Sequence, residues 1–300
     1  MHNSTLKLAM IGLDTSHAPV FTRLLNDANA PDHLSGARVV KAWPGGSPDF
    51  KPSWSRVGQF TEEVRELGVV ICNTIEEAVE NCDAVLLESA DGRVHLEQFK
   101  KLIPFNLPVF IDKPLTCSLP EAKELARLAA EHDIPVMSSS SLRFLQGLPE
   151  TVEKHRHQIT GVELSGPLSF QETQPGYFWY GIHTIEMLFA ILGPDFQSLE
   201  VHCSEHMDQV DVCSVSGIPC RLELDKEKPP FSGTLICGSR RIPLPSSATV
   251  EEPFYRSLLK EVLLFFNTRE PVVCLSETLR LIAFVAEANR LLLKQEEQNN

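Results

Sequence analysis

The segment Asp112-Lys113-Pro114 is the part of this chain best suited to chemistry. It follows the apolar run Leu107–Ile111, which predicts a buried strand, so an ammonium group stands at the carboxyl end of that strand. Open α/β sheets bind their ligands at this edge. Proline keeps Lys113 extended, where it can hydrogen-bond a substrate oxygen and transfer a proton if its pKa is lowered. A solvated lysine at an ordinary strand end is the alternative.

A histidine and a carboxylate form a second candidate group. His183 and Glu186 are three residues apart at the expected start of a helix, so they share one face. Tyr177, Trp179 and Tyr180 come just before them. An imidazole beside a carboxylate and phenols suits proton transfer to or from a hydroxyl. A histidine that only completes an apolar core is the alternative.

The first predicted strand ends at an incomplete dinucleotide-binding loop. Such loops read Gly-x-Gly-x-x-Gly, but here Gly12 is present while Asp14 and His17 take the other two positions. A carboxylate is favoured at a helix N-terminus, so Asp14 can occupy the anion site that a pyrophosphate needs. The hydroxyls of Thr15 and Ser16 can cap the helix or reach a phosphate. A local cap with no nucleotide is the alternative.

The second predicted strand, Arg38–Trp43, has no acidic residue at its end, where NAD sites hold the ribose hydroxyls. Asp49 lies further along, in the Gly/Pro/Ser-rich loop Pro44–Ser55, and only a folded loop would return it. Trp43 can stack on an adenine, although a tryptophan at a strand end often only packs. The choice between NAD and NADP therefore stays open.

Strands alternating with helices must position these residues in the first half of the chain. Thr74 with Glu77, and Ser118 with Glu121, read as capping boxes at helix starts. The pattern predicts βαβ units and a doubly wound, Rossmann-like parallel sheet. The expected strands are Leu6–Ile11, Arg38–Trp43, Val69–Cys72, Asp83–Leu87, Leu107–Ile111 and Pro135–Ser138, and the expected helices include His17–Ala28 and Leu119–His132. The hydroxyl run Ser138–Ser141 follows the last strand and faces the same crevice.

The pattern changes after about Ser140. Strands then follow one another with short turns, which predicts a mostly antiparallel sheet. Strands are expected at Val162–Phe170, Leu199–Cys203, Val210–Val215, Pro219–Leu224, Gly233–Cys237 and Arg240–Leu244, and helices at Leu148–His157, Ile182–Leu192, Pro253–Phe266 and Ser276–Lys294. We expect an α/β protein with a dinucleotide-binding domain over 1–138 and an α+β domain for substrate binding and oligomerisation over 139–300, ending in a frayed tail at 295–300.

Composition excludes several classes of protein. Of the 300 residues, 43% are hydrophobic and 22% charged, which is typical of a soluble globular chain. The net charge of -13 argues against nucleic acid or anionic membrane as partners. No signal-peptide layout opens the chain and no apolar run is long enough for a membrane span, so we expect a cytoplasmic protein. The eight cysteines form no Cys-x-x-Cys pair, which indicates reduced thiols. The spacing within His202–Asp208 matches no zinc pattern, and no metal is expected.

Several stretches together carry a family resemblance. They are Thr74–Leu86, Arg93-Val94-His95, Asp112–Leu115, Ala126–Ala130, Ile134–Met137 and Gly181-x-His183-x-x-Glu186. With the doubly wound first half, they resemble the glucose–fructose oxidoreductase, inositol dehydrogenase and rhizopine-catabolism (Gfo/Idh/MocA) family. The resemblance covers nearly the whole chain and is most specific over residues 74–145.

The resemblance implies an NAD(P)-dependent oxidoreductase that transfers a hydride to or from a sugar, cyclitol or related polyol. The family's Glu-Lys-Pro motif has Asp112 in place of glutamate, and Lys113 inherits the catalytic role. The family's second motif reads Asp-x-Gly-x-His-x-x-Asp. Its histidine corresponds to His183, which is the expected acid/base. Its last aspartate is replaced here by Glu186 and its first by Trp179. The alternatives are a non-redox binding or regulatory member, and a lyase or hydrolase that recycles the hydride internally.

The expected site residues fall into three groups. Those for catalysis are Lys113, His183 and Glu186. Those for the cofactor, NAD or NADP, are Gly12, Asp14, Thr15, Ser16, His17, Trp43, Asp112 and Pro114. Those for the substrate are His95, Tyr177, Trp179 and Tyr180. The resemblance also implies a homodimer or homotetramer.

Overall fold

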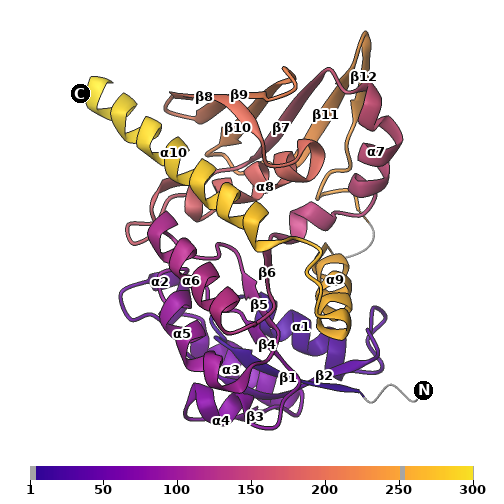
Figure 1. The fold of residues 1–300 in the computed structure, drawn as a ribbon, viewed down its shortest axis with the longest axis vertical. Coiled ribbons are helices and arrows are strands. Elements are labelled where there is room, and N and C mark those ends of the chain that lie inside the picture. The colour runs from indigo at the N-terminus through magenta and orange to yellow at the C-terminus, as the bar shows by residue number, and fades with distance from the viewer. Residues whose placement is uncertain (1–4, 251–253, 300) are drawn as a thin grey trace. The chain divides into compact units, whose positions relative to one another are not determined.

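The computed structural model describes residues 5–250 and 254–299, which divide into two compact units (Figure 1). Unit 1 comprises Met1–Ser139 and Leu258–Leu279, and unit 2 comprises Ser140–Ser257 and Arg280–Asn300. The first segment of unit 1 ends one residue after the expected boundary. Residues 258–279, which we expected in the second domain, are grouped with unit 1.

Unit 1 contains a six-stranded parallel sheet in the order β3-β2-β1-β4-β5-β6. Its strands are β1 (Leu6–Ile11), β2 (Ala37–Trp43), β3 (Val70–Ile71), β4 (Ala84–Leu87), β5 (Val109–Asp112) and β6 (Val136–Ser139). This is the strand order of doubly wound dinucleotide-binding folds, so the predicted fold is confirmed. The order reverses between β1 and β4, which places the ligand crevice at the carboxyl ends of these strands.

Helices on both faces explain why the central strands β4 and β5 are buried throughout (Figure 1). They are α1 (His17–Asn26), α2 (Lys51–Trp54), α3 (Val57–Glu66), α4 (Ile75–Val79), α5 (His95–Leu102) and α6 (Leu119–Glu131). α1 packs on α3, while α5 packs on both α4 and α6. The N-cap half of each predicted capping box forms: the Thr74 hydroxyl accepts from the Glu77 amide at 3.1 Å, and the Ser118 hydroxyl accepts from the Glu121 amide at 3.4 Å. The Glu77 carboxylate accepts from the amide of Asn73 at 3.0 Å.

Unit 2 is built around a second six-stranded sheet in the order β12-β11-β7-β10-β9-β8. Its strands are β7 (Gly161–Pro167), β8 (Phe196–Cys203), β9 (Met207–Ser214), β10 (Pro219–Asp225), β11 (Ser232–Cys237) and β12 (Arg240–Pro243). β7 and β10 are parallel and the other described neighbours are antiparallel, as expected. The nearly all-apolar helix α8 (Gly181–Leu192) packs on β7, β10 and α7 (Leu148–His155), which buries it on most sides.

Two long helices complete the chain, α9 (Phe254–Thr268) and α10 (Leu275–Asn299). The expected frayed tail is wrong, because α10 continues through it to Asn299. The side chain of Gln295 accepts a hydrogen bond from the Cys203 amide at 2.8 Å, which ties this end of the helix to β8. All eight cysteines are free thiols, as the sequence indicates. Within the described ranges, no helix is both long enough and apolar enough to cross a membrane.

Candidate functional site

The turn that joins β1 to α1 lies directly against the end of β4. Gly12 has a φ of 91°, and a Cβ atom there would lie 2.4 Å from the backbone nitrogen of Ser89. Glycine suits both this conformation and this close approach. The amides of Gly12 and Leu13 donate to the carbonyls of Trp43 and Pro44, at 2.9 and 2.8 Å. The turn therefore links the carboxyl ends of β1, β2 and β4 at the crevice edge of the sheet.

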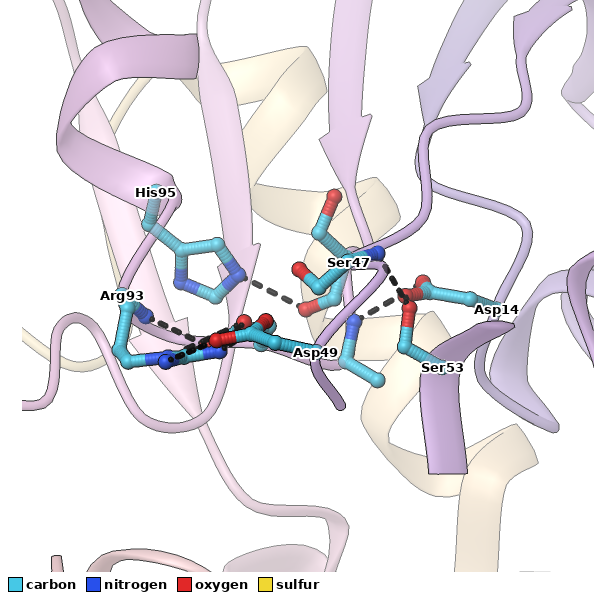
Figure 2. A network of polar contacts seen from close by, with 9 residues as sticks. Asp14, Ser47, Asp49, Ser53, Arg93 and His95 are labelled. Carbon is cyan, nitrogen blue, oxygen red and sulfur yellow. Dashed lines mark hydrogen bonds and ion pairs between the residues drawn. The ribbon is translucent and has the colours of Figure 1, made fainter. Parts of the chain in front are cut away.

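Asp14 stands where the second glycine of the fingerprint would be, and only 1% of it is exposed. One carboxylate oxygen accepts from the Ser53 hydroxyl and the other from the Ala90 amide at 3.0 Å. The Ser53 hydroxyl accepts in turn from the Ser47 amide at 2.7 Å (Figure 2). Burial raises the pKa of Asp14, and the hydrogen bonds from Ser53 and Ala90 oppose that rise. Asp14 thus holds the loop after β2 to the loop after β4.

The N-terminus of α1 has no side-chain cap. Ser16 is the N-cap residue, but its hydroxyl makes no capping hydrogen bond, and the first turn has no acidic residue. Thr15, which precedes it, is buried. The first N–H groups of a helix lack partners within the helix and carry partial positive charge, so they bind phosphate readily. In this helix Pro19 has no N–H group, and the amides of Ala18 and Val20 donate to the carbonyls of Thr15 and Ser16, so the positive end of the helix dipole is the part of a phosphate site that α1 retains.

A cavity of about 200 Å³ opens at the same edge of unit 1. It is lined by the turns after β1, β2 and β4 and by α4 and α5, through Asp14, Trp43, Gly46, Ser47, Ile75, Ser89, Val94, Glu97, Gln98 and Lys101. Because whole-ligand pockets hold roughly 300–1,000 Å³, this volume suits one part of a dinucleotide. The close approach at Gly12, the uncapped helix and this cavity fit such a cofactor, and Asp14 is the departure from the fingerprint.

Arg93 forms an ion pair with the loop that follows β2. Its guanidinium donates to both oxygens of Asp49, at 2.9 Å each, and to Asp91 at 2.7 Å (Figure 2). Asp91 is fully buried, whereas Asp49 is exposed. Asp91 first, and then Asp49, raise the pKa of Arg93, and Arg93 lowers the pKa of Asp49. The loop folds so that Asp49 reaches Arg93 in the segment after β4, but Asp49 is not among the residues that line the cavity.

Lys113 follows the last residue of β5 and is half-buried, and its peptide bond to Pro114 is cis. Beside it, Asp112 Oδ1 lies 3.3 Å from His17 Nδ1, which is also 3.3 Å from Glu88 Oε2. Burial raises the pKa of Glu88 to about 7, although the hydrogen bond from His17 opposes this. The structure thus brings together His17 and Asp112, both predicted, with Glu88, which was not. We call these three residues the acid–imidazole cluster.

His95 lies inside unit 1 and has no exposed surface. Its Nε2 lies 2.8 Å from the Ser89 carbonyl (Figure 2). Its Nδ1 lies 3.0 Å from the Pro114 carbonyl. The ring thus ties the turn after β4 to the segment after β5, and the expected substrate contact of His95 stays a prediction.

In unit 2, Ser140 fixes the ring of His183. The Ser140 hydroxyl lies 2.7 Å from Nδ1 of His183, and the Ser140 amide donates to Glu186 Oε2 at 2.8 Å. Arg143 donates to the other oxygen of Glu186 at 3.2 Å. Glu186 is only 1% exposed and its carboxylate holds the Ser140 segment in place, while its expected catalytic role stays a prediction. His183 itself is half-buried, with Tyr180 edge-on to its ring at 5.7 Å between centroids.

The three aromatic residues before α8 have different surroundings. Tyr177 is fully buried in the core and its hydroxyl donates to Asp208 at 3.1 Å, while its expected contact with a substrate stays a prediction. Burial, and then the charge of Asp208, raise its pKa. Tyr180 is 36% exposed, and the half-buried Trp179 packs edge-on against it at 6.1 Å. Trp179 and Tyr180 reach the surface of unit 2.

Sequence reasoning missed two residues that the site uses. Glu88 follows the apolar strand β4 just as Asp112 ends β5, so the strand-end position was an available signal. Nothing in the sequence indicated a role for Ser53, because its hydrogen bond to Asp14 joins residues that are 39 positions apart. Ser140 belongs to the hydroxyl run noted in the sequence, but its pairing with His183 could not be read there.

Comparison with known proteins adds a family match for the first part of the chain. Residues 7–140 match the Gfo/Idh/MocA family model, described as an oxidoreductase family with an NAD-binding Rossmann fold. No curated protein matches the sequence.

Solved structures share the fold over nearly the whole chain. The structure of GenD2 from gentamicin A biosynthesis, in complex with NAD, has a TM-score of 0.76 at 14% identity and covers 97% of this chain and 95% of its own. The myo-inositol dehydrogenase of Lactobacillus casei, in complex with NAD(H) and myo-inositol, gives 0.75 at 16% identity, with coverages of 97% and 96%. The biliverdin reductase of Synechocystis sp. PCC 6803, in complex with biliverdin and NADP+, gives 0.68 at 13% identity, with coverages of 96% and 99%. At these identities the likeness shows the shared fold.

Proposed function

We propose that the chain is an NAD-dependent oxidoreductase that transfers a hydride to or from a sugar, a cyclitol or a related polyol. The match of residues 7–140 to the model of the Gfo/Idh/MocA oxidoreductase family supports this proposal. The observation that carries the proposal is the half-buried Lys113 at the carboxyl end of β5, beside the buried Asp112. An ammonium group in this position can donate a hydrogen bond to a substrate oxygen and exchange a proton with it.

The β1–α1 turn and the neighbouring cavity are the proposed cofactor site. The positive end of the α1 dipole would attract the pyrophosphate, and the cavity beside Trp43 and Ser47 would hold the adenosine part. When bound, the nicotinamide supplies the hydride donor or acceptor. Burial raises the pKa of Asp14, which favours its uncharged form and so reduces its repulsion toward a pyrophosphate, although the hydrogen bonds from Ser53 and Ala90 oppose that rise.

His183 is the second proposed proton-transfer group. The Ser140 hydroxyl already accepts from the Leu142 amide at 3.1 Å, so its own proton can be donated to Nδ1 of His183. That hydrogen bond favours the tautomer with the proton on Nε2, and we assign proton exchange with the substrate to that atom. Glu186 supports the arrangement by holding the Ser140 amide.

The aromatic surroundings of His183 support a polyol as the substrate. The Lactobacillus casei structure contains myo-inositol and the Synechocystis structure contains biliverdin, so the shared fold alone does not choose between substrates. In this chain, Trp179 and Tyr180 lie beside an imidazole, and aromatic rings with a polar handle suit ligands that present both apolar faces and hydroxyls.

We also propose a homodimer or homotetramer formed through the sheet of unit 2. Alternate residues of β10 are exposed, which leaves one face of that strand uncovered. Multi-angle light scattering of the purified chain tests this, and a monomer at micromolar concentration would contradict it.

Turnover with a panel of sugars and cyclitols tests the proposed function. Purified protein is mixed with NAD+ or NADP+ and each substrate, and formation of the reduced cofactor is followed by absorbance. We expect Lys113→Met to abolish turnover while leaving dinucleotide binding intact. The matched control is Lys123→Met, on the exposed side of α6, which should change neither. Turnover that survives Lys113→Met would contradict the assigned role.

A further inference from the structure

The acid–imidazole cluster gathers three potential metal ligands from three neighbouring strand ends. His17 is the first residue of α1, Glu88 follows β4 and Asp112 ends β5, and β1, β4 and β5 are adjacent in the sheet. The three residues are 6%, 0% and 2% exposed. Their ligand atoms all lie within 4.8 Å of one another, which happens for no other group of three such residues in the described part of the chain.

The distances inside the cluster suit coordination better than hydrogen bonding. His17 Nδ1 is 3.3 Å from an oxygen of Glu88 and 3.3 Å from an oxygen of Asp112. One N–H group can point at only one of these oxygens, and N–H···O bonds favour about 2.9 Å. Ligands placed about 2.1 Å from a tetrahedral ion would be separated by about 3.4 Å. The observed pair of distances matches that separation.

Glu88 offers a further buried oxygen to a ligand. Its carboxylate is fully buried, and among the described contacts its Oε1 accepts no hydrogen bond. A buried carboxylate is stabilised by a positive charge or by a metal ion. The Lys113 ammonium acts on Glu88 from nearby, and the cluster itself holds two carboxylates and one imidazole.

We propose that His17, Glu88 and Asp112 form a binding site for one divalent first-row metal ion. One imidazole and two carboxylates suit Zn²⁺ and Mn²⁺, whereas the absence of a thiolate within the cluster disfavours Cu⁺. Phe21 stacks on the His17 ring, with 5.3 Å between centroids, and restricts its orientation. The ion would neutralise the buried charge next to Lys113 in the sequence. The site rests on these contacts and does not depend on the proposed substrate.

Binding of Mn²⁺ to the full chain is the direct test. Mn²⁺ is chosen because the eight free cysteines would also attract Zn²⁺. Protein stripped with a chelator is titrated with Mn²⁺ and the unbound ion is measured by electron paramagnetic resonance. We expect one ion per chain. We expect Glu88→Gln and Asp112→Asn each to weaken its binding about 100-fold or more, while Glu76→Gln, an exposed acid on α4, leaves it unchanged.

Proton release gives a second readout that a weak surface site would not reproduce. Carboxylate and imidazole ligands must lose any bound proton before they coordinate an ion, so Mn²⁺ binding at the cluster should release protons at pH 6. Calorimetric titrations in two buffers of different ionisation enthalpy should show this release in the wild type and its loss in Glu88→Gln. Circular dichroism checks that each variant folds. If Glu88→Gln does not fold, Asp112→Asn replaces it in the calorimetric comparison. No Mn²⁺ binding at millimolar concentration, or equal binding by wild type and a folded variant, would overturn the proposal.

Discussion

Replacing Gly12 with alanine should destabilise unit 1 by much more than a glycine-to-alanine change elsewhere. The residue has a φ of 91°, where an alanine costs about 1 kcal/mol. Its new Cβ would also lie 2.4 Å from Ser89 N and 2.5 Å from Ser89 Cα, so backbone must move. Overpacking of this kind costs typically about 1–3 kcal/mol. We expect Gly12→Ala to lower the free energy of unfolding by about 2–4 kcal/mol.

Gly36 provides the matched control, because it has a φ of 101° but no atom within 4 Å of the point where a Cβ atom would lie. Gly36→Ala should therefore cost only about 1 kcal/mol, from backbone conformation alone. Urea unfolding followed by tryptophan fluorescence compares the variants, since Trp43 and Trp54 both belong to unit 1. Equal losses in Gly12→Ala and Gly36→Ala would refute the close approach of the β1–α1 turn to β4.

Three further predictions concern the polar contacts of the site. In metal-free protein the folded pKa of Glu88, about 7, lies above the ordinary 4.5, so its stabilisation is complete below pH 4.5 and is lost as the pH rises to 7. Thermal melts across this range should show a loss of about 3 kcal/mol that Glu88→Gln removes. Arg93→Gln leaves the buried Asp91 unpaired and should cost about 2 kcal/mol in urea unfolding, whereas Asp49→Asn, at an exposed carboxylate, should cost less than about 1 kcal/mol. Ser140→Ala removes one hydrogen bond to His183 and should lower kcat about five- to tenfold and shift the pH–rate profile, while an unchanged profile would exclude the positioning role.

The strands of unit 1 were predictable because each is a short apolar run bounded by polar or turn residues. The boundaries of β1 agree with the prediction at both ends, and the order of the sheet follows from right-handed βαβ connections. The same reasoning placed Lys113 correctly at a strand end. It failed at the C-terminal tail, which we expected to fray because its residues are polar. There α10 continues, and the side chain of Gln295 accepts a hydrogen bond from the distant amide of Cys203.

Site residues were less predictable, because partners far apart in the sequence decide what a side chain does. Tyr177 belongs to an aromatic group typical of a binding site, yet its hydroxyl is buried and donates a hydrogen bond to Asp208, 31 positions later. His95 follows β4 as a ligand-binding residue would, yet the carbonyls of Ser89 and Pro114 engage both its nitrogens. Residue type gives the available chemistry, and tertiary contacts decide whether it is used.

Titration of the purified chain with NADH and NADPH tests the central claim most directly. Trp43 lines the cavity at the β1–α1 turn, so a bound dihydronicotinamide dinucleotide should quench its fluorescence saturably. Trp43→Phe should remove most of that signal while calorimetry still detects binding. Failure of both nucleotides to bind at millimolar concentration, measured by calorimetry on folded protein, would contradict a dinucleotide site at this edge of the sheet.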